Sequence, residues 1–253
     1  MNRFLKRAWA EIDLDALEHN YNEIKKLAKG KDILAVVKAN AYGHDDKAVC
    51  LKLQELGVKY YGVSNLWEGE KLRCHGITGT ILTFGYTDED YFDELLEYGI
   101  TQTAGSVQYA KQLSDYAVSK GVKLPVHIKV NTGMTRVGID SQQEMLDILA
   151  MPGLDCKAAY THFAAADSLD PSDVEYTDRQ QEKLMKIAKD KGLLIHSQNS
   201  GGIIYHGDFG GDIVRAGVIL YGHYPNYPLE VPFDMKSAVS YTHLRAHETD
   251  SYL

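Results

Sequence analysis

The sequence predicts an α/β fold, a (β/α)8 TIM barrel. Short apolar runs alternate with amphipathic stretches along most of the 253 residues, an order that requires parallel strands joined by crossover helices. Eight apolar runs of strand length lie between residues 33 and 221, which is the strand count of a closed barrel. Glycines follow several amphipathic stretches, where helices commonly end. They are Gly30, Gly57, Gly99, Gly121 and Gly192. An open doubly wound sheet is the competing architecture.

A strand and a helix precede the eight predicted barrel strands. Residues 8–14 alternate like a half-buried strand without an obvious partner in a barrel, and such a strand would be an exposed edge. Asp15-Ala16-Leu17-Glu18 has the form of a capping box and predicts a helix whose apolar face includes Leu17 and Ile24. We predict barrel strands at 33–38, 60–64, 80–84, 100–104, 125–131, 157–162, 194–198 and 214–221. We predict helices between them at 45–56, 88–98, 106–120 and 174–191.

Beyond residue 221 the regular order of elements ends. Pro225, Pro228 and Pro232 make the next stretch unsuited to a helix or a central strand. Residues 241–253 show neither a clear period nor turn signals, so we interpret them as a non-native tail, with a short terminal helix as the alternative. The expected organisation is a strand over 1–13, a barrel over 14–224, a linker over 225–240 and a tail over 241–253.

Composition and charge limit the partners and the compartment. A net charge of -8 without a Lys/Arg-rich run argues against nucleic acid as a partner. The longest apolar stretches are far shorter than the roughly 20 residues of a membrane span. The basic N-terminus lacks the features of a signal peptide, and the 3 cysteines show no metal spacing. We therefore expect a cytoplasmic protein with a small-molecule partner, no membrane partner and no metal ion.

Lys38 ends the apolar run over residues 33–37. A lysine at the end of a barrel strand points toward the mouth, where barrels build their active sites. Partial burial lowers the pKa of a lysine and makes it a nucleophile toward carbonyl groups, including that of pyridoxal phosphate. For Val-Val-Lys alone, a surface lysine is the more common outcome.

The longer string Lys-Ala-Asn-Ala-Tyr-Gly-His over residues 38–44 resembles the pyridoxal-phosphate attachment motif of the alanine racemase family. Further motifs match the family in order from residue 8 to about residue 224, so the resemblance covers most of the chain. It implies that Lys38 attaches the cofactor covalently and is one of two racemisation bases, and that Tyr42 contacts the cofactor phosphate. Asp45 stands where the family usually has Gly or Ala.

The strand predicted over 125–131 carries a second candidate lysine. Alternation places His127 and Lys129 on the face opposite Val126 and Ile128, so Lys129 points into the barrel if the apolar face packs against helices. A buried positive charge there must be neutralised or paired. The resemblance makes Lys129 a candidate for carbamylation and assigns Arg136 to the cofactor phenolate oxygen and the substrate carboxylate. Considered alone, this block fits a surface strand with a salt-bridged lysine better.

The last predicted strands carry a candidate phosphate site. A Ser-Gly-Gly turn that opens a helix offers backbone N–H groups and a hydroxyl to a phosphate. The resemblance assigns Asn199 and Ser200 to the cofactor, with the backbone of Gly217 and Val218 completing the phosphate site. Barrels usually bind phosphate after strands seven and eight.

Arg215 lies in an apolar strand and needs a buried partner. The resemblance places it against the pyridine nitrogen, with His162 and His196 in a hydrogen-bond chain to it. Because arginine, with a pKa above about 12, cannot accept a proton, the nitrogen stays neutral. A neutral nitrogen favours reprotonation of the substrate α-carbon over transamination or decarboxylation.

The resemblance implies a pyridoxal-phosphate-dependent amino-acid racemase, first of all one that makes D-alanine for peptidoglycan precursors. In the family the second base is a tyrosine of a C-terminal β-domain, donated across a homodimer interface. We expect this chain to be truncated before that domain, with residues 1–13 left without the partner they would pair with. None of its 17 tyrosines matches that base, so weak or no racemase activity is expected. The alternatives are a serine racemase of the glycopeptide-resistance type, a non-catalytic barrel that binds pyridoxal phosphate, and an inactive fragment.

Overall fold

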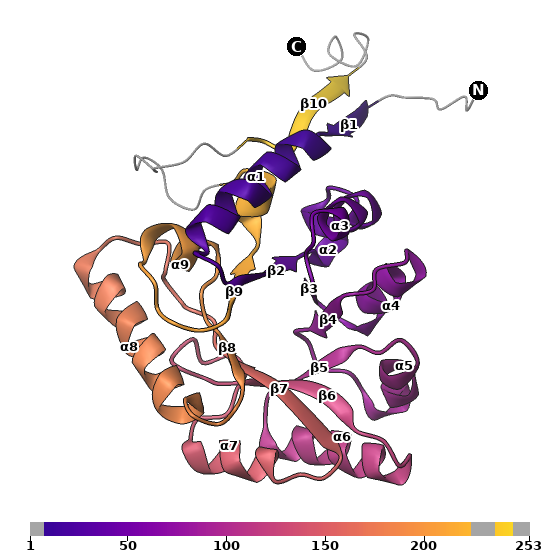
Figure 1. The fold of residues 1–253 in the computed structure, drawn as a ribbon, viewed down its shortest axis with the longest axis vertical. Coiled ribbons are helices and arrows are strands. Elements are labelled where there is room, and N and C mark those ends of the chain that lie inside the picture. The colour runs from indigo at the N-terminus through magenta and orange to yellow at the C-terminus, as the bar shows by residue number, and fades with distance from the viewer. Residues whose placement is uncertain (1–7, 224–235, 245–253) are drawn as a thin grey trace, which may run out of the picture.

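A closed barrel of eight parallel strands forms the body of the protein. The computed structural model describes residues 8–223 and 236–244, and Figure 1 shows the strands surrounded by helices. Neighbouring strands pair in the order β2-β3-β4-β5-β6-β7-β8-β9, and β2 pairs with β9 to close the barrel. The strands are β2 (Asp32–Val36), β3 (Tyr60–Val63), β4 (Thr80–Thr83), β5 (Thr101–Ala104), β6 (Leu124–Lys129), β7 (Leu154–Tyr160), β8 (Leu194–His196) and β9 (Ile213–Ala216). The predicted barrel is confirmed, and the open-sheet alternative is wrong.

Helices cover the outside of the barrel. They are α1 (Leu14–Leu27), α3 (Asp46–Glu55), α4 (Leu66–Cys74), α5 (Phe92–Glu97), α6 (Val107–Ser119), α7 (Gln142–Leu149), α8 (Pro171–Ala188) and α9 (Ser200–Tyr205), with 3-10 turns η1 (Glu89–Tyr91) and η2 (Val218–Tyr221). Helices α4 and α7 were not predicted. Helix α4 buries only Leu66, Gly69 and Leu72, too few apolar residues for a clear helical period. A capping box between Ser141 and Glu144 does mark the start of α7.

Two predicted boundaries are wrong for identifiable reasons. Helix α1 begins at Leu14, because Asp13 is the N-cap and its side chain accepts the N–H of Ala16 at 2.9 Å, so the capping box expected at Asp15 does not form. The strand predicted over 214–221 ends at Ala216. Gly217 has φ -106° and ψ -112°, which interrupts the extended backbone, and the next residues form η2.

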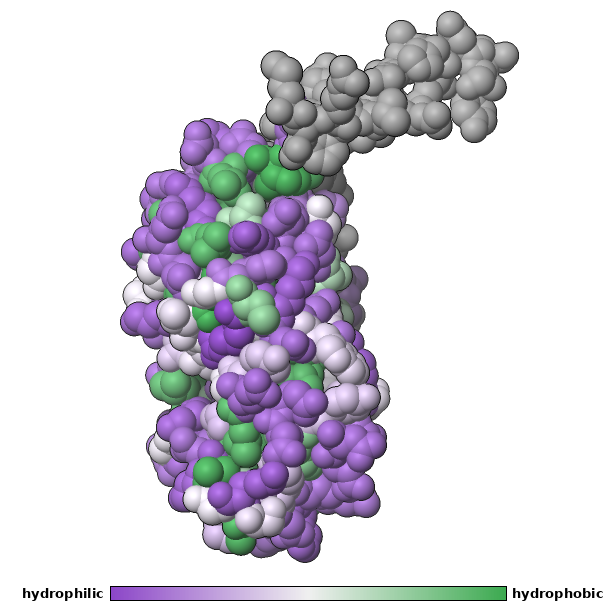
Figure 2. Space-filling view, turned by 90° about the vertical axis from the view of Figure 1, so that its right-hand side faces the viewer, coloured by the Kyte–Doolittle hydropathy of each residue, from purple (hydrophilic) through white to green (hydrophobic). Residues whose placement is uncertain are grey.

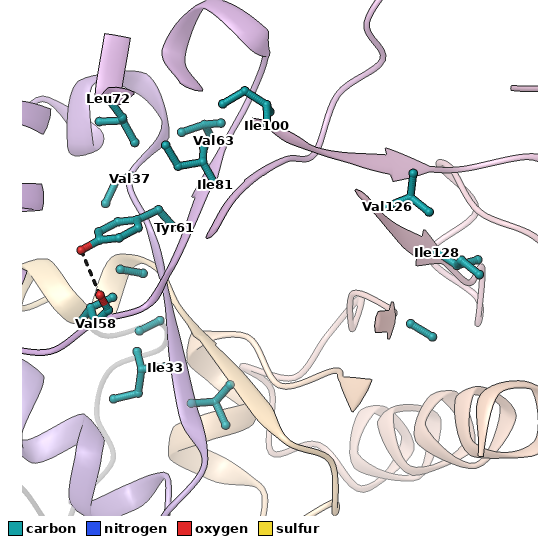
Figure 3. Packing of buried hydrophobic residues seen from close by; sticks show 14 of the residues in the cluster. Ile33, Val37, Val58, Tyr61, Val63, Leu72, Ile81, Ile100, Val126 and Ile128 are labelled. Atoms are coloured by element: carbon teal, nitrogen blue, oxygen red, sulfur yellow. Dashed lines mark hydrogen bonds between the residues drawn. The ribbon is translucent and has the colours of Figure 1, made fainter. Parts of the chain in front are cut away.

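The hydrophobic core lies mainly between the strands and the helices. Figure 3 shows outward-facing strand residues such as Ile33, Val63, Ile81 and Val126. The barrel interior holds a smaller cluster that includes Leu34 and Leu82, with Phe84 packed against it. Gly62 faces this cluster, and a Cβ there would lie 2.6 Å from the Phe84 ring. A larger residue at this position would therefore force the side chains of Phe84 and Leu34 to shift.

Strand β1 (Ala8–Ile12) pairs antiparallel with β10 (Val239–Leu244), and Figure 1 shows this ribbon projecting beyond the barrel near α1. As expected, β1 has no partner within the barrel, but the expectation that it is left as an unpaired edge is wrong. The first four residues of the expected tail, 241–244, form a strand rather than the alternative terminal helix. Residues 1–7, residues 224–235, which include most of the expected linker, and the rest of the tail (245–253) lie outside the described residues.

The buried side chain of Asn20 fastens the last segment to α1. Its amide donates to the carbonyls of Leu220 (3.0 Å) and Lys236 (2.7 Å), and its oxygen accepts the N–H of Lys236 at 2.7 Å. These bonds explain a buried asparagine in an otherwise apolar helix face.

The surface over α3, α4 and α5 is largely hydrophilic, with small, scattered apolar patches (Figure 2). None of the helices in the described ranges combines the length and the hydropathy needed to span a bilayer.

Candidate active site

A cavity of about 410 Å³ opens at the carboxyl ends of the barrel strands, and the predicted site residues converge on it. Ten of them line the cavity: Lys38, Tyr42, Lys129, Arg136, His162, Asn199, Ser200, Arg215, Gly217 and Val218. His196 does not line it and lies fully buried below Arg215. Residues that the sequence did not indicate, including Phe84, Tyr160 and Asp167, also line the cavity. Among the described residues no group of three His, Cys, Asp or Glu side chains could hold a metal ion.

Lys38 is half-buried and directly precedes an unusual turn. Residues 39–42 all have φ between 53° and 55°, so α2 (Lys38–Tyr42) is a left-handed turn. Each such residue costs roughly 1–2 kcal/mol when it is not glycine. Non-glycine residues in the left-handed conformation are held there by the surrounding structure, and they are common at functional sites. The turn brings Tyr42 back to the cavity that Lys38 enters.

Ser200, Gly217 and Tyr42 form a polar cradle at the cavity wall. The hydroxyl of Ser200 accepts the N–H of Gly217 at 3.2 Å. A Cβ at Gly217 would lie 3.4 Å from both the Ser200 Oγ and the Tyr42 Oη, an ordinary van der Waals distance, so the two hydroxyls and the Gly217 backbone meet at one part of the wall. Asn199 contributes by shaping this wall, because its side chain caps α9 and accepts the N–H of Gly202 at 3.0 Å.

Arg215 is buried on β9 without a carboxylate hydrogen-bond partner among the described residues. Its guanidinium donates to the carbonyls of Thr161 (2.7 Å), His196 (2.9 Å) and Ser197 (2.9 Å). Burial lowers the pKa of Arg215 to about 10, so the group stays charged at neutral pH. Its Nη2 also lies 3.4 Å from the Nδ1 of His162.

A chain of neutral imidazoles continues from Arg215 into the barrel. Arg215 Nη1 lies 3.3 Å from His196 Nδ1, and His196 Nε2 lies 3.1 Å from His127 Nδ1. Because a guanidinium can only donate, His196 accepts at Nδ1 and donates from Nε2 to His127. Burial lowers the pKa of His127 to about 4 and that of His162 to about 3, and it places the pKa of His196 well below its ordinary value. His127 is a member of this chain that the sequence did not reveal.

Tyr160 forms the floor below the charged groups. Its ring stacks on His196 at 4.7 Å, and its hydroxyl lies 2.9 Å from the Thr103 hydroxyl. The Arg215 guanidinium and the Lys129 Nζ each lie 5.5 Å from the ring centroid, and the Arg215 charge is within cation–π distance. Tyr160 precedes His162 by two residues, so strand alternation was the one sequence signal for it.

Lys129 points into the barrel as predicted and is 6% exposed. Its Nζ donates to the carbonyl of Val130 at 2.8 Å and forms no ion pair within the described part of the chain. Burial lowers the pKa of Lys129 to about 7, and the positive charges of Arg215 and Arg136 add to this effect. A large fraction of Lys129 is therefore uncharged at neutral pH.

Comparisons with known proteins agree with this geometry. The family model described as "Alanine racemase, N-terminal domain" matches residues 12–225. The chain is 39% identical to the alanine racemase of Clostridium perfringens over 236 residues, which covers 89% of this chain and 60% of that protein. A solved structure of the alanine racemase of Clostridium difficile 630 has a TM-score of 0.82 and 36% identity, over 88% of this chain and 60% of that chain. A histidine racemase from Leuconostoc mesenteroides subsp. sake has a TM-score of 0.85 and 27% identity, over 94% and 66% of the two chains. The chain thus spans about 60% of the length of the curated relative.

Proposed function

The chain belongs to the alanine racemase family, and from this premise we propose that it is the cofactor-binding barrel of a pyridoxal-phosphate-dependent amino-acid racemase acting on alanine. The observation that carries the proposal is one cavity with Lys38 at a strand end and the cradle of Ser200, Gly217 and Tyr42 on its wall. The two hydroxyls of Ser200 and Tyr42 beside the Gly217 backbone suit a phosphate, and a lysine amine suits an aldehyde. The residues present therefore fit the cofactor.

The proposed mechanism assigns one task to each group. When bound, pyridoxal phosphate supplies an electron sink that acidifies the substrate α-carbon. Lys38 Nζ holds or delivers the proton on one face of that carbon. Arg136 binds the substrate carboxylate. Arg215, held by three carbonyls, presents a charge that cannot accept a proton, so a cofactor nitrogen held beside it would stay unprotonated.

A second base is needed on the opposite face, and the cavity tyrosines do not suit it. Tyr42 belongs to the cradle. The Tyr160 hydroxyl is buried against Thr103, and burial raises its pKa to about 12. We propose that the second base comes from outside the described barrel, in a homodimer of the family type. The 253-residue chain alone is then expected to racemise alanine weakly or not at all.

The 39% identity to the Clostridium perfringens alanine racemase supports alanine as the proposed substrate. A non-catalytic barrel that only binds the cofactor is the remaining alternative class. Exchange of the α-proton of L-alanine in D2O separates the two classes. Exchange with retention of configuration needs only one base, Lys38, so a racemase barrel can catalyse it without the second base that racemisation requires. The racemase barrel should catalyse exchange, and a cofactor carrier should not.

The cofactor site is tested by borohydride reduction after incubation with pyridoxal phosphate. Reduction converts the lysine–cofactor linkage into a stable amine, and we expect the adduct on the peptide that contains Lys38. Lys38→Ala should abolish both the adduct and the absorbance band of the bound cofactor. Lys47→Ala, an exposed lysine on α3, should change neither. An adduct that survives Lys38→Ala would contradict the proposed site.

We further propose that Lys129 is carbamylated. A neutral amine attacks CO2 and releases one proton, and the resulting carbamate would be an anion between Arg215 and Arg136. Carbon-13 bicarbonate should therefore give a carbamate NMR signal that is absent in Lys129→Met. The same signal should persist in Lys31→Met, because Lys31 directly precedes β2 and is already paired with Asp208. A spectrum without a Lys129-dependent signal would refute this modification.

A further inference from the structure

One carboxylate, that of Glu68, holds the left-handed turn after Lys38 from outside. Glu68 lies in the first turn of α4, and its own N–H donates to the N-cap side chain of Asn65 at 3.1 Å. One of its oxygens accepts the backbone N–H of Ser64 at 2.7 Å, and the other accepts the N–H of Ala39 at 2.8 Å. The carboxylate thus joins the chain just beyond two adjacent barrel strands, β2 and β3.

The hydrogen bonds within the turn do not determine its left-handed conformation. Ala41 N–H donates to Val37 O at 2.9 Å, and Gly43 N–H donates to Ala39 O at 3.0 Å. A right-handed turn forms bonds of the same spacing at lower steric cost. Contacts from outside the turn must therefore select the left-handed form, and the Glu68 bond acts on its first residue, Ala39.

A second outside contact acts on the next residue of the turn. The Asn40 side-chain oxygen accepts the N–H of Asp46 at 3.1 Å and lies 3.4 Å from the Lys71 Nζ. Lys71 is on α4, as Glu68 is, and pairs with Asp46 at 2.8 Å. Helix α4 therefore contacts the first two residues of the turn, although Glu68 does not itself line the cavity.

We propose that Glu68 is a positioning residue that sets Lys38 and Tyr42 relative to each other. Lys38 directly precedes Ala39, whose N–H donates to the Glu68 carboxylate. Tyr42 ends the left-handed turn with its hydroxyl beside Gly217. A shift of Ala39 would therefore change the position of Lys38, which is proposed to bind the cofactor covalently, relative to Tyr42, which forms one side of the cradle. This inference rests on the proposed function, because it assumes that both residues bind one cofactor.

Glu68→Gln tests the two hydrogen bonds of the carboxylate with little change in side-chain volume. A carboxylate offers two acceptor oxygens, whereas an amide offers one and turns its NH2 toward a backbone N–H. The matched control is Glu70→Gln, since Glu70 is on the same helix and hydrogen-bonds Tyr98, away from the turn. Glu68→Asp keeps the charge but is too short to reach both N–H groups, and it replaces Glu68→Gln if that variant does not fold.

The first measurement is amide hydrogen exchange in the chain without cofactor. Segment 38–44 should exchange faster in Glu68→Gln than in the unsubstituted chain, while Glu70→Gln should leave it unchanged. The second is the affinity for pyridoxal phosphate, followed by absorbance. It should fall roughly tenfold to a hundredfold, as expected for a lost hydrogen bond to a charged group. The thermal midpoint should stay near that of Glu70→Gln.

The outcomes are separable. Unchanged amide exchange over residues 38–44 in Glu68→Gln would show that Glu68 does not hold the left-handed turn. Faster exchange with unchanged cofactor affinity would overturn the positioning role. If the unsubstituted chain takes up no cofactor at Lys38, the proposed function and the positioning role both fail, while exchange still decides whether Glu68 holds the turn.

Discussion

Arg215→Leu is expected to lower the free energy of unfolding by about 2–5 kcal/mol. The substitution removes the donor for the carbonyls of Thr161, His196 and Ser197. It also leaves the Nδ1 of His196 without its partner deep in the barrel. The desolvation cost of the guanidinium is relieved at the same time, which keeps the expected loss below the sum of four separate bonds. Urea unfolding followed by circular dichroism measures the change.

The control for this prediction is Arg179→Leu. Arg179 pairs with Glu175 on the surface of α8, and its side chain is 58% exposed. Exposed pairs contribute roughly 0–1 kcal/mol, so this variant should unfold nearly like the unsubstituted chain. Equal stabilities for the two leucine variants would mean that the carbonyl network around Arg215 does not contribute to the fold. Arg215→Lys should lie between them, because an ammonium keeps the charge but not the planar fork of donors.

The barrel could be predicted because its strands are buried on both faces and read as apolar runs. Strand alternation also placed Lys129 inside the barrel, since its neighbours Ile128 and Val130 are apolar. The left-handed turn could not be predicted in this way. Ala39 and Ala41 have no intrinsic preference for positive φ, and the contact that holds them comes from Glu68, 29 residues further along the chain.

The residues of the imidazole chain also differ in whether the sequence indicates them. His162 and Arg215 carried a sequence signal through their motifs, whereas His127 and Tyr160 acquire their roles only through contacts among neighbouring strands. His127 meets His196 from β6, and Tyr160 stacks on the same ring from β7. These contacts depend on the register of the neighbouring strands β6, β7 and β8, in which Tyr160 lies opposite His196, and a single sequence does not give that register.

Lowering the pH from 6.5 to 4 is expected to destabilise the fold through His127 and His196. Burial holds the pKa of His127 at about 4, against an ordinary value of 6.5 in the unfolded chain. Between these values the unfolded state binds more protons, so the free energy of unfolding rises with pH and is lost as the pH falls. For His127 alone the difference corresponds to about 3 kcal/mol. Lys129 acts in the same direction from about pH 7 to 10.5, because the folded chain again binds fewer protons.

His127→Asn isolates the acid part of this dependence. The asparagine side-chain oxygen can accept the hydrogen bond from His196 in place of Nδ1, but it cannot be protonated in this range. The variant should therefore lose less stability between pH 6.5 and 4 than the unsubstituted chain, in urea titrations at several pH values. His223→Asn, at an exposed histidine outside the barrel interior, should keep the full acid dependence. If the unsubstituted chain and His127→Asn lose stability equally on acidification, protonation of His127 does not destabilise the fold in acid, and the neutral state assigned to His127 would have to be abandoned.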